Sequence, residues 1–322
     1  MRAKGLLDIY ILEILANHSS MKYRLKQKDI MYYLEEDYNI QVNRNTLSTY
    51  LEELKEYGYI AGDRGVYLVR KFSNSEIKLL INTIIYSKSI PSKDIHNIVC
   101  KLKDIAEPEL RKNLRNVYYI DNMDHTENKN VCDIIETIDQ AIQECKKIEI
   151  TSCKYDVKGK LVETGTRIID PYYIVAEKSR YYLLCYAGRL DIEPRRIDRI
   201  SKVRILKEKR LDIKQIEKYK NYDFSIADYM REHIYMYSGE NERITIKVKM
   251  DNIGDGIDWY GSDYRIVKVE EPDVIITIKA NSNAVYFWAL QYGGIAEIIK
   301  PVELRNSIKH GLEDMLEKYK KT

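Results

Sequence analysis

Two parts of this sequence carry basic and polar side chains at spacings that could bind an anionic partner. One is a polar series at the start of a predicted helix over 44–57, with an arginine in the turn after that helix: Arg44, Asn45, Ser48, Thr49 and Arg64. Such side chains donate hydrogen bonds to the base edges and phosphates of DNA. The other is the run 193–210, which holds eight basic and three acidic residues. Since the whole chain has a net charge of only +3, nucleic-acid binding would depend on local patches of this kind.

The elements that position the first series follow a familiar order. Apolar residues at three- and four-residue spacing predict helices from Leu6 to about 17–20, over 27–37 and over 44–57. In the third helix, capped by Asn43, an apolar stripe faces the core, so the polar series lies on the exposed side. A hairpin over 59–69 follows, with Arg64 at its tip. This order predicts a winged helix-turn-helix on double-stranded DNA. The alternative is a small α/β module that binds protein or no partner.

The composition argues against several other classes of protein. The five cysteines and five histidines lack a Cys-x-x-Cys pair and the short spacing of a zinc site, so we expect no metal. The sequence also lacks the usual nucleophile, phosphate-loop, zinc-protease and dinucleotide motifs, which predicts neither an enzyme nor a cofactor. No apolar run approaches the roughly 20 residues of a membrane span, and no secretory signal is recognisable. We therefore expect a cytoplasmic protein without a membrane partner.

The rest of the chain divides into a helical, a strand-rich and a mixed part. Helical patterns over 72–90, 93–105 and 109–114 predict a spacer, and a polar hinge at 121–130 precedes a helix over 131–146. From 147 to 207 alternating apolar residues predict a small antiparallel barrel or sandwich, with strands at 148–155, 160–169, 172–176, 181–186, 192–197 and 201–206. A β-α-β-β-α-β order over 243–319, with its first helix at 252–259, predicts a ferredoxin-like unit.

Several motifs in these regions resemble the WYL-domain regulators of bacteria. They are Pro-Tyr-Tyr-Ile at 171–174, Arg-Tyr-Tyr-Leu at 180–183 and Arg-Ile-Asp-Arg-Ile at 196–200. Tyr181 stands where the family usually has tryptophan. The resemblance extends upstream through the helix-turn-helix and the helix that opens with Ser-Asn-Ser-Glu-Ile at 73–77. Downstream it includes Asp-Trp-Tyr-Gly at 258–261, Phe-Trp-Ala-Leu-Gln-Tyr-Gly at 287–293 and Pro-x-Glu-Leu-Arg at 301–305.

The resemblance implies a small Sm-like barrel that senses nucleic acid or a nucleotide-like anion. The matching effector positions are Tyr155, Arg167, Tyr181, Arg196 and Arg199. Arginine grips phosphate bidentately and tyrosine offers a stacking face for a base. Strand alternation would place Arg195 and Arg199 on one face and Arg196 and Asp198 on the other. The alternative is that Arg199 pairs with Asp198 or with another acidic residue of the barrel, and that the tyrosines belong to the core.

These expectations define an α+β protein of four parts. They are a winged helix-turn-helix at 1–71, a helical linker at 72–128, a sensing barrel with its leading helix at 129–211, and a ferredoxin-like dimerisation domain at 212–322. Trp259, Phe287 and Trp288 are expected in its core or dimer interface. The predicted function is transcription regulation by a homodimer whose operator binding responds to the effector. The alternative is a single-stranded nucleic-acid-binding accessory protein, for example in phage defence, with the barrel as the main binder.

Overall fold

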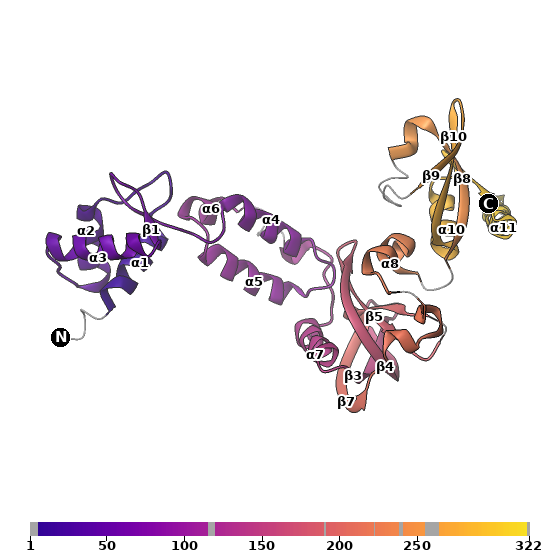
Figure 1. Cartoon of the computed structure of the whole chain (residues 1–322), viewed down its shortest axis with the longest axis horizontal. Helices are drawn as coiled ribbons and strands as arrows, with labels where there is room; N and C mark the ends of the chain where they lie inside the picture. The colour runs from indigo at the N-terminus through magenta and orange to yellow at the C-terminus, as the bar shows by residue number, and fades with distance from the viewer. Residues whose placement is uncertain are drawn as a thin grey trace. The chain divides into compact units, whose positions relative to one another are not determined.

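The chain divides into two units, Met1–Lys129 and Asn130–Thr322, which we describe one at a time (Figure 1). The computed structural model describes residues 6–114, 120–189, 191–221, 223–237, 241–254 and 264–320. It is an α+β structure whose strand pairs are all antiparallel within the described residues. No helix in this part of the chain is long and apolar enough to cross a membrane.

The first unit begins with three helices and a short hairpin, as the sequence predicted. The helices are α1 (Leu7–His18), α2 (Gln27–Tyr38) and α3 (Arg44–Glu56), and the hairpin pairs β1 (Ile60–Ala61) with β2 (Tyr67–Leu68). One face of each helix supplies the core, which includes Ile11, Ile30 and Leu47. Asn39 ends α2 in the left-handed conformation with φ 55°, so the chain turns sharply towards α3. A bridge between Leu25 and Val66 adds a third extended segment to the hairpin.

Asn43 caps α3, the helix that carries most of the first polar series. Its side-chain oxygen accepts a hydrogen bond from the backbone N–H of Thr46 at 2.8 Å. Replacing Asn43 with alanine leaves that N–H without its partner and is expected to cost about 1 kcal/mol of unfolding free energy. Chemical denaturation of the full chain measures this change, and Asn43→Asp, which retains a capping oxygen, is the matched control. A loss of equal size in both variants would contradict the capping role.

Two arginines fasten the end of α1 to the helices that follow. The linker contains α4 (Asn74–Ile85), α5 (Ser92–Asp104) and α6 (Pro108–Asn113). Arg70 donates to the carbonyl oxygen of Ala16 at 2.8 Å, and Arg111 from α6 donates to the same oxygen at 3.3 Å and to Asn17 at 3.0 Å. Burial and the neighbouring Arg111 lower the pKa of Arg70. These bonds satisfy carbonyl groups that the helix end would leave without partners, so α6 is tied directly to α1.

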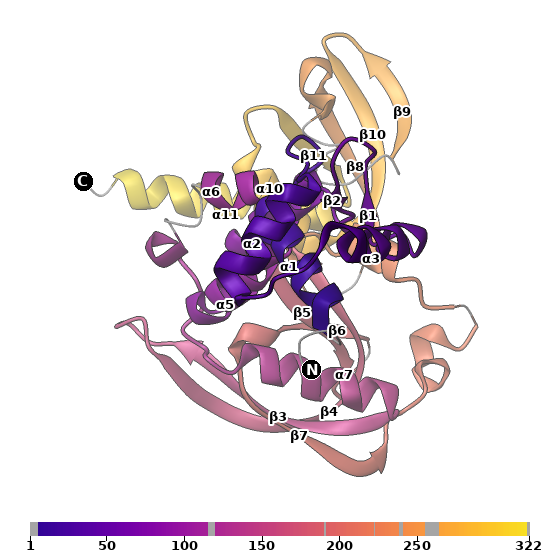
Figure 2. The ribbon, with the colours of Figure 1, turned by 90° about the vertical axis from the view of Figure 1, so that its left-hand side faces the viewer.

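The second unit begins with α7 (Val131–Gln143) and a five-stranded sheet. The strands are β3 (Lys146–Tyr155), β4 (Leu161–Glu177), β5 (Arg180–Tyr186), β6 (Glu193–Arg196) and β7 (Ile200–Lys209), in the order β6-β5-β4-β3-β7. The two views show α7 along the concave side of the bent strands β3, β4 and β7 (Figures 1 and 2). Its apolar face packs on isoleucines of the sheet, including Ile148, Ile150 and Ile169.

The sheet differs from the predicted barrel in two respects. Among the described residues no pairing joins the edge strands β6 and β7, so the predicted closed barrel was wrong. The reason is that β6 has only four residues and a 3-10 turn, η3 (Ile197–Arg199), leads straight into β7. The predicted strands 160–169 and 172–176 form one continuous strand, β4, whose register shifts between Pro171 and Tyr173. Proline lacks the N–H that regular pairing would use.

A segment without a sequence-based assignment covers the other face of this sheet. It contains the 3-10 turns η4 (Ile213–Gln215), η5 (Glu217–Tyr219) and η6 (Ile234–Met236) and the helix α8 (Ile226–Glu232). Tyr219 and Tyr229 from this segment pack with Tyr172 and Leu184 of the sheet. The second half of β4 and β5 are therefore buried on both faces, whereas the first half of β4 is exposed.

His233, which follows α8, is held as a neutral imidazole. The side chain is 2% exposed, its Nδ1–H donates to the Tyr229 carbonyl oxygen at 2.9 Å, and its ring stacks on that of Tyr229 at 3.8 Å. Burial lowers the pKa of His233 below its usual value of 6.5.

The lowered pKa of His233 predicts a loss of stability on acidification. In the unfolded chain His233 takes up a proton as the pH falls through about 6.5, whereas in the folded chain it resists protonation. The free energy of unfolding should therefore fall as the pH drops from 7.5 to 5.5. Urea denaturation at these two pH values measures the fall, which should be smaller in His233→Gln. An identical fall in both chains would show that other groups cause it.

The last part of the second unit contains a four-stranded sheet together with the helices α10 and α11. It contains β8 (Asn241–Lys249), the 3-10 turn η7 (Met250–Asn252), β9 (Arg265–Glu270), β10 (Asp273–Asn281), α10 (Ser282–Gln291), β11 (Ala296–Lys300) and α11 (Val302–Lys320). The strand order is β11-β8-β10-β9. Trp288 is 1% exposed and belongs to the core, whereas Phe287 is 49% exposed. Trp259, most of the predicted helix 252–259 and the motif 258–261 lie outside the described residues, so the ferredoxin-like assignment stays a prediction.

Candidate nucleic-acid interface and arginine cluster

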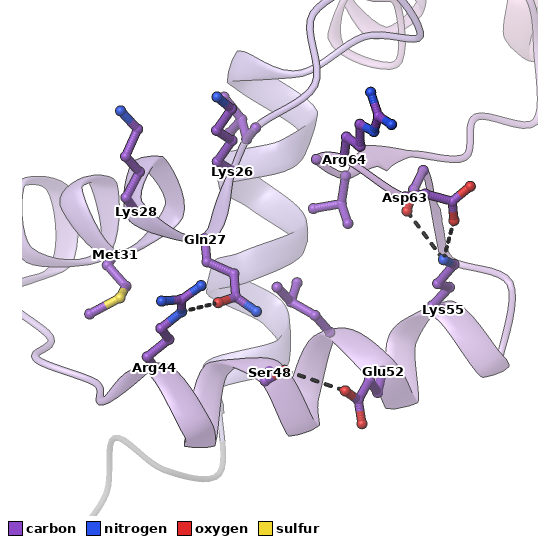
Figure 3. Close-up of a pocket in the computed structure, with 15 residues that line it drawn as sticks. Lys26, Gln27, Lys28, Met31, Arg44, Ser48, Glu52, Lys55, Asp63 and Arg64 are labelled. Atoms are coloured by element: carbon purple, nitrogen blue, oxygen red, sulfur yellow. Dashed lines mark hydrogen bonds and ion pairs between the residues drawn. The ribbon is translucent and has the colours of Figure 1, made fainter.

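A groove of about 590 Å³ lies between the starts of α2 and α3 and the hairpin (Figure 3). Five basic side chains line it, and they come from three elements: Lys26, Lys28, Arg44, Lys55 and Arg64. Glu52 and Asp63 are the acidic residues of its lining. Although the net charge of the chain is only +3, the groove therefore carries a local excess of positive charge. A groove of this kind attracts phosphate groups.

The predicted recognition residues divide into two groups. Arg44, Ser48 and Arg64 line the groove, whereas Asn45 and Thr49 are exposed on α3 outside the lining. Arg44 donates from Nε to Gln27 Oε1 at 3.0 Å, and Ser48 donates to Glu52 at 3.3 Å. The Thr49 hydroxyl donates to the Asn45 carbonyl oxygen at 3.2 Å. The start of α3 thus presents Arg44 to the groove, with one of its donors already used to orient it.

An ion pair links the end of α3 to the turn of the hairpin. Lys55 Nζ lies 2.9 Å from Asp63 Oδ1 and donates to the Gly62 carbonyl oxygen at 3.2 Å. The hydrogen bond from Lys55 holds the pKa of Asp63 below its usual range. Gly62 has φ 111°, and a Cβ atom there would lie 2.2 Å from the Gly65 carbonyl oxygen, so this turn requires glycine. The turn leaves Arg64 exposed beside α3.

Lys26 and Lys28 belong to the groove although the sequence analysis did not select them. Lys26 is the residue before α2, and Lys28 lies in its first turn. In Figure 3 both lie at the start of α2, across the groove from Ser48 and Glu52 of α3. In the sequence, these two lysines flank Gln27 at the start of the second predicted helix, and this basic pair could have indicated their role.

A second basic site forms where β5, β6 and η3 meet, and we call it the arginine cluster: Arg180, Arg196 and Arg199 around Asp198, with Tyr155 and Tyr182 beside them. The Asp198 side chain is only 1% exposed. Arg196 donates to it from Nε at 3.0 Å and from Nη2 at 2.5 Å, and Arg180 Nη1 lies 3.6 Å away. Burial opposes the charge of Arg196, but the hydrogen bonds and charge of Asp198 outweigh burial and raise its pKa. One carboxylate therefore holds two arginines.

Arg199 is placed differently from the other two arginines. Its guanidinium carbon lies 4.1 Å from the centre of the Tyr155 ring, a cation–π contact. Burial and the neighbouring Arg196 lower the pKa of Arg199. Its Nε is buried, and no hydrogen-bond partner reaches it from the described part of the chain. Since the cluster holds three guanidinium groups and one carboxylate, it carries an excess of positive charge with aromatic faces beside it.

The structure brings together three of the five predicted effector residues, Tyr155, Arg196 and Arg199. Arg167 is exposed opposite Ile150, and its side chain forms no hydrogen bond or ion pair within the described residues. Tyr181 is partly buried against the core under α7. The predicted grouping of Arg196 with Asp198 is confirmed, since Arg196 donates to Asp198. The predicted separation of Arg199 from them was wrong, because η3 interrupts the extended chain at Ile197.

Two other residues of the cluster were not selected as site residues, although they flank Tyr181 in the quoted motif. They are Arg180 and Tyr182. Burial raises the pKa of Tyr182, while the two arginines Arg196 and Arg180 act to lower it. Half of the eight basic residues in the run 193–210 are neutralised, since Arg195, Arg196, Lys202 and Arg204 each pair with an acidic residue. Arg199 of the cluster belongs to the other half.

Comparison with known proteins places the arginine cluster in a known domain. The WYL domain family model matches residues 133–205, a range that includes all six residues of the cluster. No curated protein sequence matches the chain. Within the described residues, no group of three or more His, Cys, Asp or Glu side chains could hold a metal ion.

Two solved structures are similar to the chain. One is the proteasome accessory factor B/C (PafBC) of Arthrobacter aurescens, at 14% identity and a TM-score of 0.32, with 97% of this chain covered. The chain spans about half, 48%, of that protein. The other is a CRISPR Cas-related protein, at 12% identity and a TM-score of 0.40, with 98% of this chain and 85% of that chain covered. The family match is the more specific finding: residues 133–205 match the WYL domain, so the chain contains a WYL domain.

Proposed function

We propose that this WYL-domain protein is a DNA-binding transcription regulator of the cytoplasm and not an enzyme. Its first 71 residues act as a winged helix-turn-helix, with α3 as the recognition helix and the hairpin as the wing. The WYL domain senses a nucleic-acid or nucleotide-like effector and modulates operator binding by a homodimer. The observation that carries the proposal is the basic groove at the start of α3.

Duplex binding is supported by the fact that the basic side chains of the groove come from different elements. Arg44 comes from α3, Lys26 and Lys28 from the start of α2, and Arg64 from the hairpin. A recognition helix in the major groove places its first turn against base edges while neighbouring elements contact phosphates. Arg44 and Ser48, with the exposed Asn45 and Thr49, would then face the bases, and the other basic residues would contact the backbone.

The arginine cluster supports the sensing role. Arg199 pairs with no carboxylate among the described residues, and its guanidinium lies on the Tyr155 ring. A phosphate could take its free donors while a base stacks on a tyrosine. Arg196 is already held by two hydrogen bonds to Asp198, so its role would be to position the cluster. We propose Arg199 and Arg180 as the arginines that contact the effector.

The dimer and the hinge complete the proposal. One groove of this size offers few base contacts, so tight and specific binding would require two copies on a two-fold operator. The C-terminal residues 212–322 would supply the dimer contact. The boundary between the two units at Lys129 and Asn130 lies within the predicted hinge 121–130. Effector binding would act through this hinge to re-aim the two recognition helices.

Selection from random duplexes with the full-length chain tests the proposal. The selected duplex and its separate strands are then compared in binding assays with wild type, Arg44→Ala/Ser48→Ala and Arg180→Ala/Arg199→Ala. If the protein is a regulator, the wild type should bind the duplex more tightly than its separate strands. Of the two variants, only Arg44→Ala/Ser48→Ala should abolish this preference. Single-strand preference abolished only by the second variant would instead support the accessory protein, a role that the tyrosines beside the arginines would suit. Duplex binding unchanged by Arg44→Ala/Ser48→Ala would overturn α3 as the recognition helix.

A further inference from the structure

The hairpin between β4 and β5 has a strained two-residue turn. Glu177 and Arg180 form the last pair of the ladder, so Lys178 and Ser179 make the turn. Both have left-handed backbone conformations, with φ 47° and 64°. Turns of this type favour Asn-Gly, because in this conformation a Cβ atom lies too close to the following carbonyl oxygen, a cost that glycine avoids and asparagine tolerates. A lysine and a serine hold it only where neighbouring contacts compensate.

The compensating contact comes from the segment that enters the C-terminal sheet. Lys178 Nζ lies 4.2 Å from the centre of the Tyr235 ring, and burial lowers the pKa of Lys178. Tyr235 and Met236 are themselves left-handed, with φ 60° and 53°. The Tyr235 hydroxyl donates to Gln291 Oε1 of α10 at 3.1 Å. The cation–π contact therefore joins two strained turns. The turn that contains Tyr235 also contacts α10 through the Tyr235 hydroxyl.

The same hairpin carries part of the arginine cluster. Arg180 directly follows the turn and lies 3.6 Å from Asp198, and Tyr182 follows on the same strand. Arg180 forms the last pair of the ladder with Glu177, so a shift of its backbone moves the turn that contains Lys178. The two-residue turn therefore connects Arg180 of the cluster to Lys178, which contacts Tyr235.

We propose that the contact between Lys178 and Tyr235 couples the arginine cluster to α10. An anion that draws Arg180 away from Asp198 shifts the turn, and Tyr235 then changes its bond to Gln291. This inference rests on the proposed function only in assigning ligand binding to the cluster. By reciprocity, any partner that changes the packing of α10 alters ligand affinity at the cluster.

Hydrogen exchange of the full-length chain, without DNA or ligand, tests the coupling. Arg180→Met imitates the release of Arg180 from Asp198, and the readout is exchange in α10. The measurement is made with the natural turn and with Lys178→Asn/Ser179→Gly, which removes the ammonium group while supplying the residues that this turn prefers. Lys158→Gln, in the exposed turn between β3 and β4, is the control for removal of a lysine at a hairpin. Exchange in β4 and β5 confirms that the hairpin is folded.

With the natural turn, Arg180→Met should raise the exchange of α10 amides about fivefold, the lower end of typical coupling between sites. Arg180→Lys should act in the same direction but less. With the Asn-Gly turn, Arg180→Met should change amide exchange in β5 but not in α10. With the natural turn, Lys158→Gln should leave the effect of Arg180→Met on α10 unchanged. No change in α10 with the natural turn, or an equal change with both turns, overturns the coupling. Since no nucleic acid is present, this outcome is independent of the binding experiments that test the proposed function.

Discussion

Replacing Arg44 and Arg64 together with alanine is expected to weaken duplex binding by the full-length chain about 100-fold. Each arginine that contacts a base or phosphate contributes about 1–3 kcal/mol, and 1.4 kcal/mol is a factor of ten. The two side chains come from α3 and the hairpin, and both line the same groove. Fluorescence anisotropy with a selected duplex measures the affinity. The salt dependence should also become shallower, by about 0.9 in the logarithmic slope for each phosphate that is no longer neutralised.

The matched control for this pair removes the same charge elsewhere in the first unit. Lys88 and Lys101 are exposed and lie outside the groove, so Lys88→Ala/Lys101→Ala should change affinity only slightly. Circular dichroism of both variants checks that α1 to α3 remain folded. Equal weakening by the two double variants would show that overall charge drives binding, and the groove would then lose its role as the interface.

The N-terminal helices could be predicted from the sequence because their signals are local. Leu47, Leu51 and Leu54 repeat at helical spacing and are all buried in the structure. Asn43 precedes them as a cap and accepts the expected bond from the helix start. Periodicity and capping depend on neighbours within one or two turns. For the same reason the exposed positions of Arg44 and Arg64 could be predicted, whereas the contribution of Lys26 depends on how two helices pack.

The arginine cluster could be predicted only in part, because it depends on a local departure from strand geometry. The alternating pattern around Arg196 and Asp198 indicates a strand, but η3 turns the chain at Ile197 and gathers these side chains with Arg199. A three-residue turn inside an alternating sequence leaves no periodic signal. Arg180 joins the cluster from another strand, and pairing between strands does not follow from one sequence.

The aromatic layer over the back of the WYL sheet was missed for a similar reason. Tyr219 and Tyr229 come from short turns and one short helix within residues 211–237. Elements of this length have too few residues to show a period. Their burial is decided by the sheet face on which they pack, and so by tertiary contacts such as those with Tyr172 and Leu184.

Asp198 offers the largest expected effect on stability. Its carboxylate is 1% exposed, and it accepts two hydrogen bonds from Arg196, whose side chain is 26% exposed. Asp198→Ala leaves a largely buried guanidinium without its partner and is expected to cost about 3–5 kcal/mol of unfolding free energy. Urea denaturation measures the loss, and hydrogen exchange in β4 and β5 assigns it to the WYL domain. The exposed ion pair of Lys202 and Glu163 is the matched control, since Glu163→Ala should cost less than about 1 kcal/mol.

A second substitution separates the charge of Asp198 from its volume. If the cost of Asp198→Ala arises from the unpaired guanidinium, then Arg196→Met in the same chain should recover much of the lost stability, because both charges are then absent. If the cost arises from the cavity alone, Arg196→Met should recover nothing. Recovery of stability together with continued binding of a nucleotide would show that the ligand needs no contact with Arg196. Recovery with loss of binding would show that Arg199 and Arg180 do not bind the ligand without Arg196.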